Sequence, residues 1–297
     1  VNPLCSLADS DVYSIPMVLL VGWRGEPGVK DEPQHVRQGA ITLGQLDLLE
    51  IPYRILAPDT TIAQFDADFQ ELLSEMKRGK TVAFVVEKGA IQSDLSPVYG
   101  NEYSMTRETA AGLILSAADP EDVFVTTTGK LSREVFEWRE SRNEDHARDF
   151  LTVGSMGHAS MIALGMAVDK PDRRIWCLDG DGALLMHLGA LQLIAERQPS
   201  NLVHVIINNE AHDTVGGMPV SGGSLNASSL ASAAGYPSVF TVNSEETLKD
   251  ALKKITGSET SGPVLLEVRC ACGSRANLGR PTTTPAQNRD ALMSFLQ

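Results

Sequence analysis

Short apolar segments rich in Val, Ile and Leu recur along the chain, and turn-forming residues such as Gly, Pro and Asn bound them. Runs of this kind are typical of strands that are buried on both faces of a parallel sheet. The pattern predicts strands at 16–22, 53–56, 81–86, 123–127, 151–153, 174–178, 202–207, 239–242 and 264–268.

Segments with helical periodicity separate several of these strands, and we expect helices over 43–49, from 60 or 61 to about 77, and over 109–118 and 183–197. The second of these helices has Thr60 or Thr61 as its N-cap. Its apolar residues share one face, and they are Ile62, Phe65, Phe69, Leu72, Leu73 and Met76. Strands that alternate with helices indicate an α/β fold with doubly wound parallel sheets.

The chain has 297 residues, which is enough for about two domains. Residues 88–104 mix Gly, Ser, Pro and Asn without a clear period, and such a stretch is typical of an interdomain linker. We therefore expect a first domain with its linker at 1–95 and a second domain at 96–297.

The chain carries 38 acidic and 25 basic side chains, so its formal charge is −13. This balance argues against a nucleic-acid partner or an anionic membrane surface, because both require clustered Lys and Arg. No apolar run reaches the ~20 residues that span a bilayer, and no signal segment opens the sequence. The cysteines form no disulfide framework, Cys177 is expected to be a core thiol, and Cys270 and Cys272 lack zinc-site spacing. A cytoplasmic protein is expected.

Small polar residues follow the predicted strands of the second domain, where ligands of parallel sheets bind. Gly180-Asp181-Gly182 lies between a strand and a helix, and backbone N–H groups at such a junction can cradle a phosphate. An aspartate would repel that phosphate unless it also bound a divalent cation. A second oxygen ligand is offered by Asn208-Asn209, which follow the next strand after 25 intervening residues (183–207).

This pairing resembles the signature of the thiamine-diphosphate-dependent 2-oxoacid decarboxylases. Several longer stretches are similar to phosphonopyruvate decarboxylases, with sulfopyruvate decarboxylases as near relatives. They are GWRGEPGVKDEPQH (22–35), TTTGKLSRE (126–134), GSMGHAS (154–160), GDGALLMHLGAL (180–191), NNEAHDTVGG (208–217) and LGRPTTTP (278–285). The resemblance implies decarboxylation of 3-phosphonopyruvate to phosphonoacetaldehyde and CO₂, a step of phosphonate biosynthesis, with thiamine diphosphate and Mg²⁺ as cofactors.

The resemblance also implies roles for particular residues of the second domain. Asp181, Asn209 and the carbonyl group of Ala211 would bind Mg²⁺, and His212 with Asp213 would form the acid–base pair. The cofactor would contact a wider set, which comprises Thr128, Gly129, Gly154, Ser155, Met156, Gly180, Asp181, Gly182, Ala183 and Asn209. A dianionic substrate needs cations, and the candidates are Arg24, Lys30, His35, Lys130, His212, Arg275 and Arg280.

By the same resemblance, the first domain is the later part of a pyrimidine-binding domain and the second is the diphosphate-binding domain. The cofactor would lie between domains of different subunits, so a homodimer or a higher homo-oligomer is expected. The family's activating glutamate belongs to a segment that precedes the position of Val1. We therefore expect an N-terminally truncated first domain and a poorly active chain.

Three alternatives are weighed against this interpretation. Sulfopyruvate decarboxylation would use the same cofactor and the same basic residues. A non-catalytic subunit or remnant that binds the cofactor would explain the absent glutamate region. A nicotinamide-dependent dehydrogenase is disfavoured, because no G-x-G-x-x-G follows a predicted strand.

Overall fold

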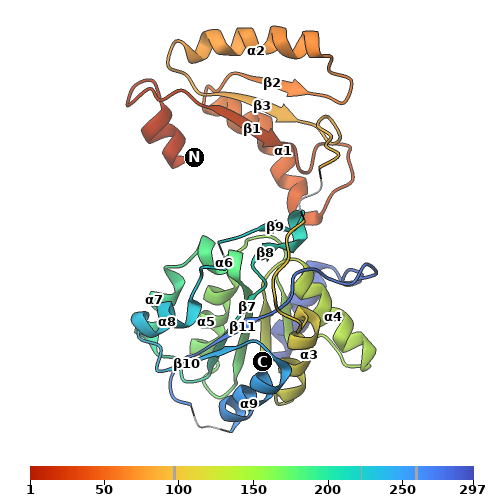
Figure 1. Ribbon diagram of the computed structural model, residues 1–297, viewed down its shortest axis with the longest axis vertical. Coiled ribbons are helices and arrows are strands. Elements are labelled where there is room, and N and C mark those ends of the chain that lie inside the picture. The colour runs from red at the N-terminus through yellow and green to blue at the C-terminus, as the bar shows by residue number, and fades with distance from the viewer. Residues whose placement is uncertain (96–97, 222, 258–259) are drawn as a thin grey trace. The chain divides into compact units, whose positions relative to one another are not determined.

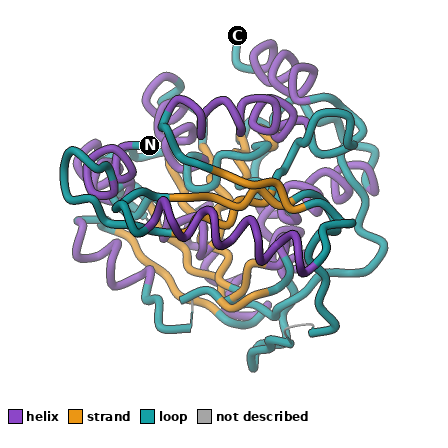
Figure 2. The backbone as a smooth tube through the Cα atoms, turned by 90° about the horizontal axis from the view of Figure 1, so that it is seen from above, coloured by secondary structure: helices purple, strands orange, loops and turns teal. Residues whose placement is uncertain are grey.

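The computed structural model describes residues 1–95, 98–221, 223–257 and 260–297. The chain divides into two compact units, Val1–Ser96 and Pro97–Gln297. Parallel strands alternate with helices in both (Figures 1 and 2), so the α/β fold predicted from the sequence is confirmed. None of the helices in the described ranges is both long and apolar enough to cross a membrane.

The first unit contains a three-stranded parallel sheet in the order β1-β3-β2. Its elements are η1 (Leu4–Ala8), β1 (Val18–Gly22), α1 (Pro33–Leu48), β2 (Tyr53–Leu56), α2 (Ile62–Met76) and β3 (Val82–Val86). Side chains of β3 alternate between two apolar clusters, because successive residues of a strand face opposite sides. Ala83 and Val85 pack with Leu46 of α1, whereas Val82 and Phe84 pack with Leu72 of α2.

Two details of this unit differ from the predicted helices. Thr61 is the N-cap of α2 and forms a capping box with Gln64, as the sequence suggests, but Ile62 is 82% exposed and does not belong to the buried face. The helix expected over 43–49 begins ten residues earlier, at Pro33. A proline is tolerated at this first helical position because its missing N–H would have no partner there.

The second unit contains a six-stranded parallel sheet in the order β10-β11-β7-β6-β4-β5. Its strands are β4 (Val123–Thr126), β5 (Asp149–Leu151), β6 (Ile175–Gly180), β7 (Leu202–Asn208), β10 (Ser238–Val242) and β11 (Val264–Arg269). A short antiparallel pair, β8 (Ala211–His212) and β9 (Met218–Pro219), follows β7 and flanks the 3₁₀ turn η2 (Asp213–Val215).

Helices cover both faces of this sheet (Figure 1). Those that pack on one face are α3 (Arg107–Ala117), α4 (Lys130–Ser141) and α9 (Glu245–Thr256). Those that pack on the other face are α5 (Ala159–Asp169), α7 (Ala190–Arg197), α8 (Ala227–Ala234) and α10 (Pro285–Phe295). This doubly wound arrangement buries every residue of β4 and β7, as their apolar sequences predict.

Two expectations for this unit are wrong in detail. The helix expected over 183–197 is two helices, α6 (Asp181–Met186) and α7, because the chain leaves helical geometry at His187 and restarts after Gly189. The short strand expected at 151–153 is β5, which ends at Leu151. The register of β4, β6 and β7 places Thr126 beside Leu178 and Gly180 beside Ile207, so the loops after these strands share one edge.

Candidate active site

The Gly180-Asp181-Gly182 turn and the loop after β7 are joined by hydrogen bonds to one carboxylate. The Gly182 N–H donates to Asp181 Oδ1 over 2.7 Å, and the Glu210 N–H donates to Asp181 Oδ2 over 2.7 Å. Asp181 begins α6 directly after β6, so the strand and the helix start fix its position. The two motifs that the sequence separates by 25 residues therefore meet at one carboxylate.

The environment of Asp181 suits a bound cation. The side chain is buried with 4% of its surface exposed, and burial raises its pKa to about 6, although the N–H groups of Gly182 and Glu210 oppose this rise. A buried carboxylate that has only neutral backbone donors as hydrogen-bond partners is costly in its charged form. A divalent cation would offset that cost, and carboxylate oxygen is a ligand that Mg²⁺ prefers.

Asn209 presents its amide oxygen through a fixed orientation of the side chain. Its Nδ2 donates to Asp213 Oδ2 over 2.7 Å, which turns Oδ1 to the other side. Oδ1 accepts one long hydrogen bond of 3.4 Å from the Ala211 N–H. An amide oxygen carries two lone pairs. Among the described residues only the Ala211 N–H donates to Oδ1, so one lone pair remains that could bind a metal ion.

Asp213 is anchored from three directions. Its Oδ2 also accepts from Arg107 Nη1 over 2.7 Å, and the Gly273 N–H contacts both oxygens at 3.1 and 3.2 Å. No hydrogen bond joins it to His212 in the part of the chain that the structure describes. These contacts make Asp213 a positioning residue for Asn209, and its acid–base role stays a prediction.

Arg107 is a site residue that the sequence patterns did not reveal. It is the first residue of α3 and is 6% exposed. Its Nε and Nη2 each donate to Glu134 over 2.7 Å, while Nη1 reaches Asp213. The partners lie 27 and 106 residues away along the chain, so no local motif could have signalled this contact.

Two of the predicted cofactor glycines lie in close contact with the segment that follows β7. A Cβ on Gly182 would lie 2.6 Å from His212 Cε1, so the imidazole packs directly on the turn. A Cβ on Gly129, which has a φ of +110°, would lie 2.6 Å from Thr214 Oγ1. Side chains at these positions would push the neighbouring loop away, because contacts under 3.0 Å are not tolerated.

The loop after β5 joins the same edge. The Gly154 N–H donates to Thr128 Oγ1 over 2.9 Å, and Ser155 takes the left-handed backbone conformation with a φ of 47°. A Cβ on Gly157 would come within 2.7 Å of the Ala183 carbonyl oxygen. The structure therefore brings the predicted turns at 128–129, 154–157 and 180–183 together.

The predicted substrate cations differ in their environments. Arg275 is held by Glu108 over 2.9 Å and by Glu137. Arg280 lies in the loop between β11 and α10, with an exposed side chain. Lys130 begins α4 immediately after Gly129, and its N–H donates a long hydrogen bond of 3.4 Å to Thr214 Oγ1.

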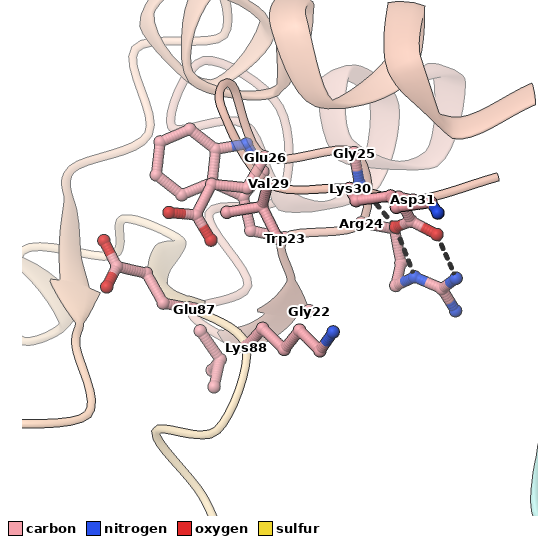
Figure 3. A pocket seen from close by; sticks show the side chains of 11 residues that line it. Gly22, Trp23, Arg24, Gly25, Glu26, Val29, Lys30, Asp31, Glu87 and Lys88 are labelled. Carbon is pink, nitrogen blue, oxygen red and sulfur yellow. Dashed lines mark hydrogen bonds and ion pairs between the residues drawn. The ribbon is translucent and has the colours of Figure 1, made fainter. Parts of the chain in front are cut away.

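The remaining candidates, Arg24, Lys30 and His35, lie in the first unit. Arg24 and Lys30 line a pocket of 390 Å³ at the carboxyl end of β1 and β3 (Figure 3). Figure 3 shows the Arg24 guanidinium facing the Asp31 carboxylate, with Nε and Nη2 donating over 2.8 and 2.5 Å. These bonds and the contact with His35 hold the pKa of Asp31 well below its usual range. Asp31 therefore neutralises Arg24.

Comparisons with known proteins identify the family to which the second unit is similar. Residues 127–268 match the family described as thiamine pyrophosphate enzyme, C-terminal TPP binding domain. The chain is 34% identical to phosphonopyruvate decarboxylase of Streptomyces viridochromogenes, over 99% of this chain and 76% of the relative. It is 33% identical to the enzyme of the same name from Streptomyces hygroscopicus, over 96% of this chain and 72% of that enzyme. The β subunit of sulfopyruvate decarboxylase from Methanocaldococcus jannaschii is 33% identical over 46% of this chain and 70% of that subunit.

The site and the matched domain define a thiamine-diphosphate-dependent carboxy-lyase that decarboxylates 2-oxoacids. Since the likeness to the Streptomyces enzymes extends over nearly the whole chain, the chain belongs to the phosphonopyruvate decarboxylase family.

Proposed function

We propose that the protein catalyses Mg²⁺-dependent decarboxylation of 3-phosphonopyruvate in phosphonate biosynthesis. The products are phosphonoacetaldehyde and CO₂, and the aldehyde carries a proton where the carboxylate was lost. The observation that carries the proposal is how much of this chain aligns with each relative. The alignment covers 99% of this chain for a phosphonopyruvate decarboxylase but 46% for a sulfopyruvate decarboxylase subunit.

The second unit supplies the groups that would hold the cofactors. Asp181, Asn209 Oδ1 and the Ala211 carbonyl group would bind Mg²⁺, whose hard-oxygen preference they match. The backbone of Gly182 and Ala183, at the start of α6, would meet the diphosphate, although the Gly182 N–H donates to Asp181 Oδ1 in this structure. When bound, thiamine diphosphate supplies the electron sink that makes loss of CO₂ possible.

Two side chains of this unit are assigned to the substrate. His212 packs against Gly182 and is half-buried, so it can move a proton close to the diphosphate-binding turn. Lys130 lies at the start of α4, where its ammonium group and the positive end of the helix dipole would together attract a phosphonate. We assign Arg275 a structural role, since Glu108 and Glu137 neutralise it.

The direct test is turnover of 3-phosphonopyruvate, sulfopyruvate and pyruvate by the purified chain with thiamine diphosphate and Mg²⁺. We expect CO₂ release with phosphonoacetaldehyde as the phosphorus-containing product, and a higher kcat/KM for phosphonopyruvate than for the other two acids. A preference for sulfopyruvate would favour the second candidate, which the likeness to sulfopyruvate decarboxylase subunits supports. Because a poorly active chain is expected, the ratio of the three kcat/KM values decides, and a preference for pyruvate over both other acids would refute the substrate class.

Cofactor binding is tested separately by calorimetric titration with thiamine diphosphate and Mg²⁺. Asp181→Ala should abolish binding, whereas Lys249→Ala, an exposed change in α9, should leave it unchanged. The expected homodimer or higher homo-oligomer is measured on the same sample by light scattering. A monomer that binds and turns over the substrate would contradict that part of the proposal.

A further inference from the structure

A cluster of metal-binding side chain types lies within the core of the second unit, outside the site described above. Cys177 and Asp179 belong to β6, and His204 belongs to β7. Residues two apart on a strand face the same side, and Cys177 pairs with His204 in the sheet register. One ligand atom from each residue lies within 4.8 Å of the other two.

All three side chains are enclosed. Cys177 and His204 are completely buried, and Asp179 is 1% exposed. The surroundings are the apolar cluster beneath α5, α7 and α8, to which Cys177 itself belongs. Carboxylate and imidazole groups are expensive to bury in such a place unless they have partners.

Two polar atoms at the centre of the cluster lack hydrogen bonds. Asp179 Oδ2 and His204 Nε2 face each other at 3.5 Å, and neither has a hydrogen-bond partner in the described structure. The other oxygen, Oδ1, accepts from the Gly180 N–H over 2.9 Å, which fixes the carboxylate. The separation of 3.5 Å is close to the spacing of about 3.4 Å between two ligands that a tetrahedral ion holds at 2.0–2.1 Å.

We propose that Cys177, Asp179 and His204 form a buried site for one divalent transition-metal ion, for which zinc fits best. The set of one sulfur, one nitrogen and one oxygen donor suits zinc and disfavours Mg²⁺ and Ca²⁺. A thiolate and a carboxylate balance the two charges of the ion, so the loaded site is neutral within its apolar surroundings. Three protein ligands leave the fourth tetrahedral position for a water molecule.

The groups around the cluster support this assignment. His204 Nδ1 lies 3.5 Å from the hydroxyl group of the buried Tyr236, and the second nitrogen of a metal-bound histidine usually has a polar partner. Because the site is enclosed, the ion would enter during folding.

The test is the zinc content of the full chain, which does not depend on the proposed function. The protein is produced in zinc-supplemented medium, dialysed against EDTA, and analysed by mass spectrometry of its metals. We expect about one zinc ion per chain, because a buried site releases its ion only on unfolding. Cys177→Ala and His204→Gln should each lower the content at least tenfold.

Three controls keep the outcome unambiguous. Cys270→Ala removes another completely buried thiol and should retain zinc. Asp181→Ala should also retain zinc while it loses cofactor binding, which separates this site from the proposed Mg²⁺ site. If the ligand variants do not fold, the unmodified protein produced in cobalt-supplemented medium should still show the thiolate-to-cobalt charge-transfer absorption. Parent protein without bound zinc or cobalt, or ligand variants with the parent's zinc content, would overturn the proposal and leave a buried Asp–His pair.

Discussion

Removing the charge of Arg107 is predicted to destabilise the second unit strongly. In Arg107→Met, the chain keeps most of the side-chain volume but loses the guanidinium between Glu134 and Asp213. Glu134 is 2% exposed, and burial already raises its pKa even with Arg107 present. Removing one partner of a buried ion pair costs about 3–5 kcal/mol, because the other charge is left without compensation. We expect a loss of this size from a total of about 5–15 kcal/mol.

The loss is measured by urea unfolding, with the fluorescence of Trp138 and Trp176 as the probe of the second unit. Lys249→Met is the matched control, since it removes a cation from an exposed pair with Glu245 (3.2 Å) that contributes only ~0.5 kcal/mol. Adding Glu134→Gln to Arg107→Met should recover part of the stability, because one stranded carboxylate is then neutral. A loss of stability under about 1 kcal/mol, similar to that of the control, would refute the argument. The ion pairs of Arg107 would then behave like exposed pairs, not buried ones.

The remaining predictions concern the cofactor turn, the substrate cation, the first unit and the metal. Gly182→Ala should weaken thiamine diphosphate binding roughly tenfold, about 1.4 kcal/mol, because the new Cβ would displace His212; unchanged calorimetric affinity would contradict this. Lys130→Met should raise KM for phosphonopyruvate more than it lowers kcat, and an unchanged KM would remove Lys130 from the substrate site. Because the folded-state pKa of Asp31 lies below its unfolded value, its bond to Arg24 stabilises the first unit above about pH 4 and is lost as the pH falls towards the folded-state pKa. Asp31→Asn should abolish that part of the dependence of stability on pH, which is measured by the fluorescence of Trp23 during acid unfolding. An acid transition that the substitution leaves unaltered would contradict a stabilising role of the Asp31–Arg24 pair. EDTA should release thiamine diphosphate from the chain, and added Mg²⁺ should restore binding; retention of the cofactor in EDTA would exclude a metal-anchored diphosphate.

The strands of this protein could be predicted from the sequence because the apolar pattern of a buried strand depends only on its own residues. The run at 53–56 coincides with β2, and the runs at 202–207 and 264–268 end one residue before β7 and β11 do. A strand buried on both faces is apolar throughout, whatever it pairs with. The polar helix α4 was not predicted from periodicity, because the buried residues Ser132, Glu134 and Arg139 interrupt its apolar pattern.

Part of the candidate site was also readable from the sequence. Parallel strands present their carboxyl ends at one edge, so motifs after neighbouring strands must meet there. That rule predicts the proximity of Asp181 to the Asn208-Asn209 turn, and the hydrogen bond from Glu210 to Asp181 agrees with it. The break in the helix after Met186 was not predictable, because the apolar pattern continues through it.

The sequence by itself determined the alternation of strands and helices, the loops that carry polar chemistry, and the class of cofactor. The tertiary structure alone decided which charges meet. Arg107 finds Asp213 across 106 residues, and the register of β6 against β7 brings Cys177 beside His204. Apolar periodicity is fixed by each residue and its near neighbours, whereas a buried ion pair or ligand cluster depends on sheet order and register, which arise only when distant segments pack together.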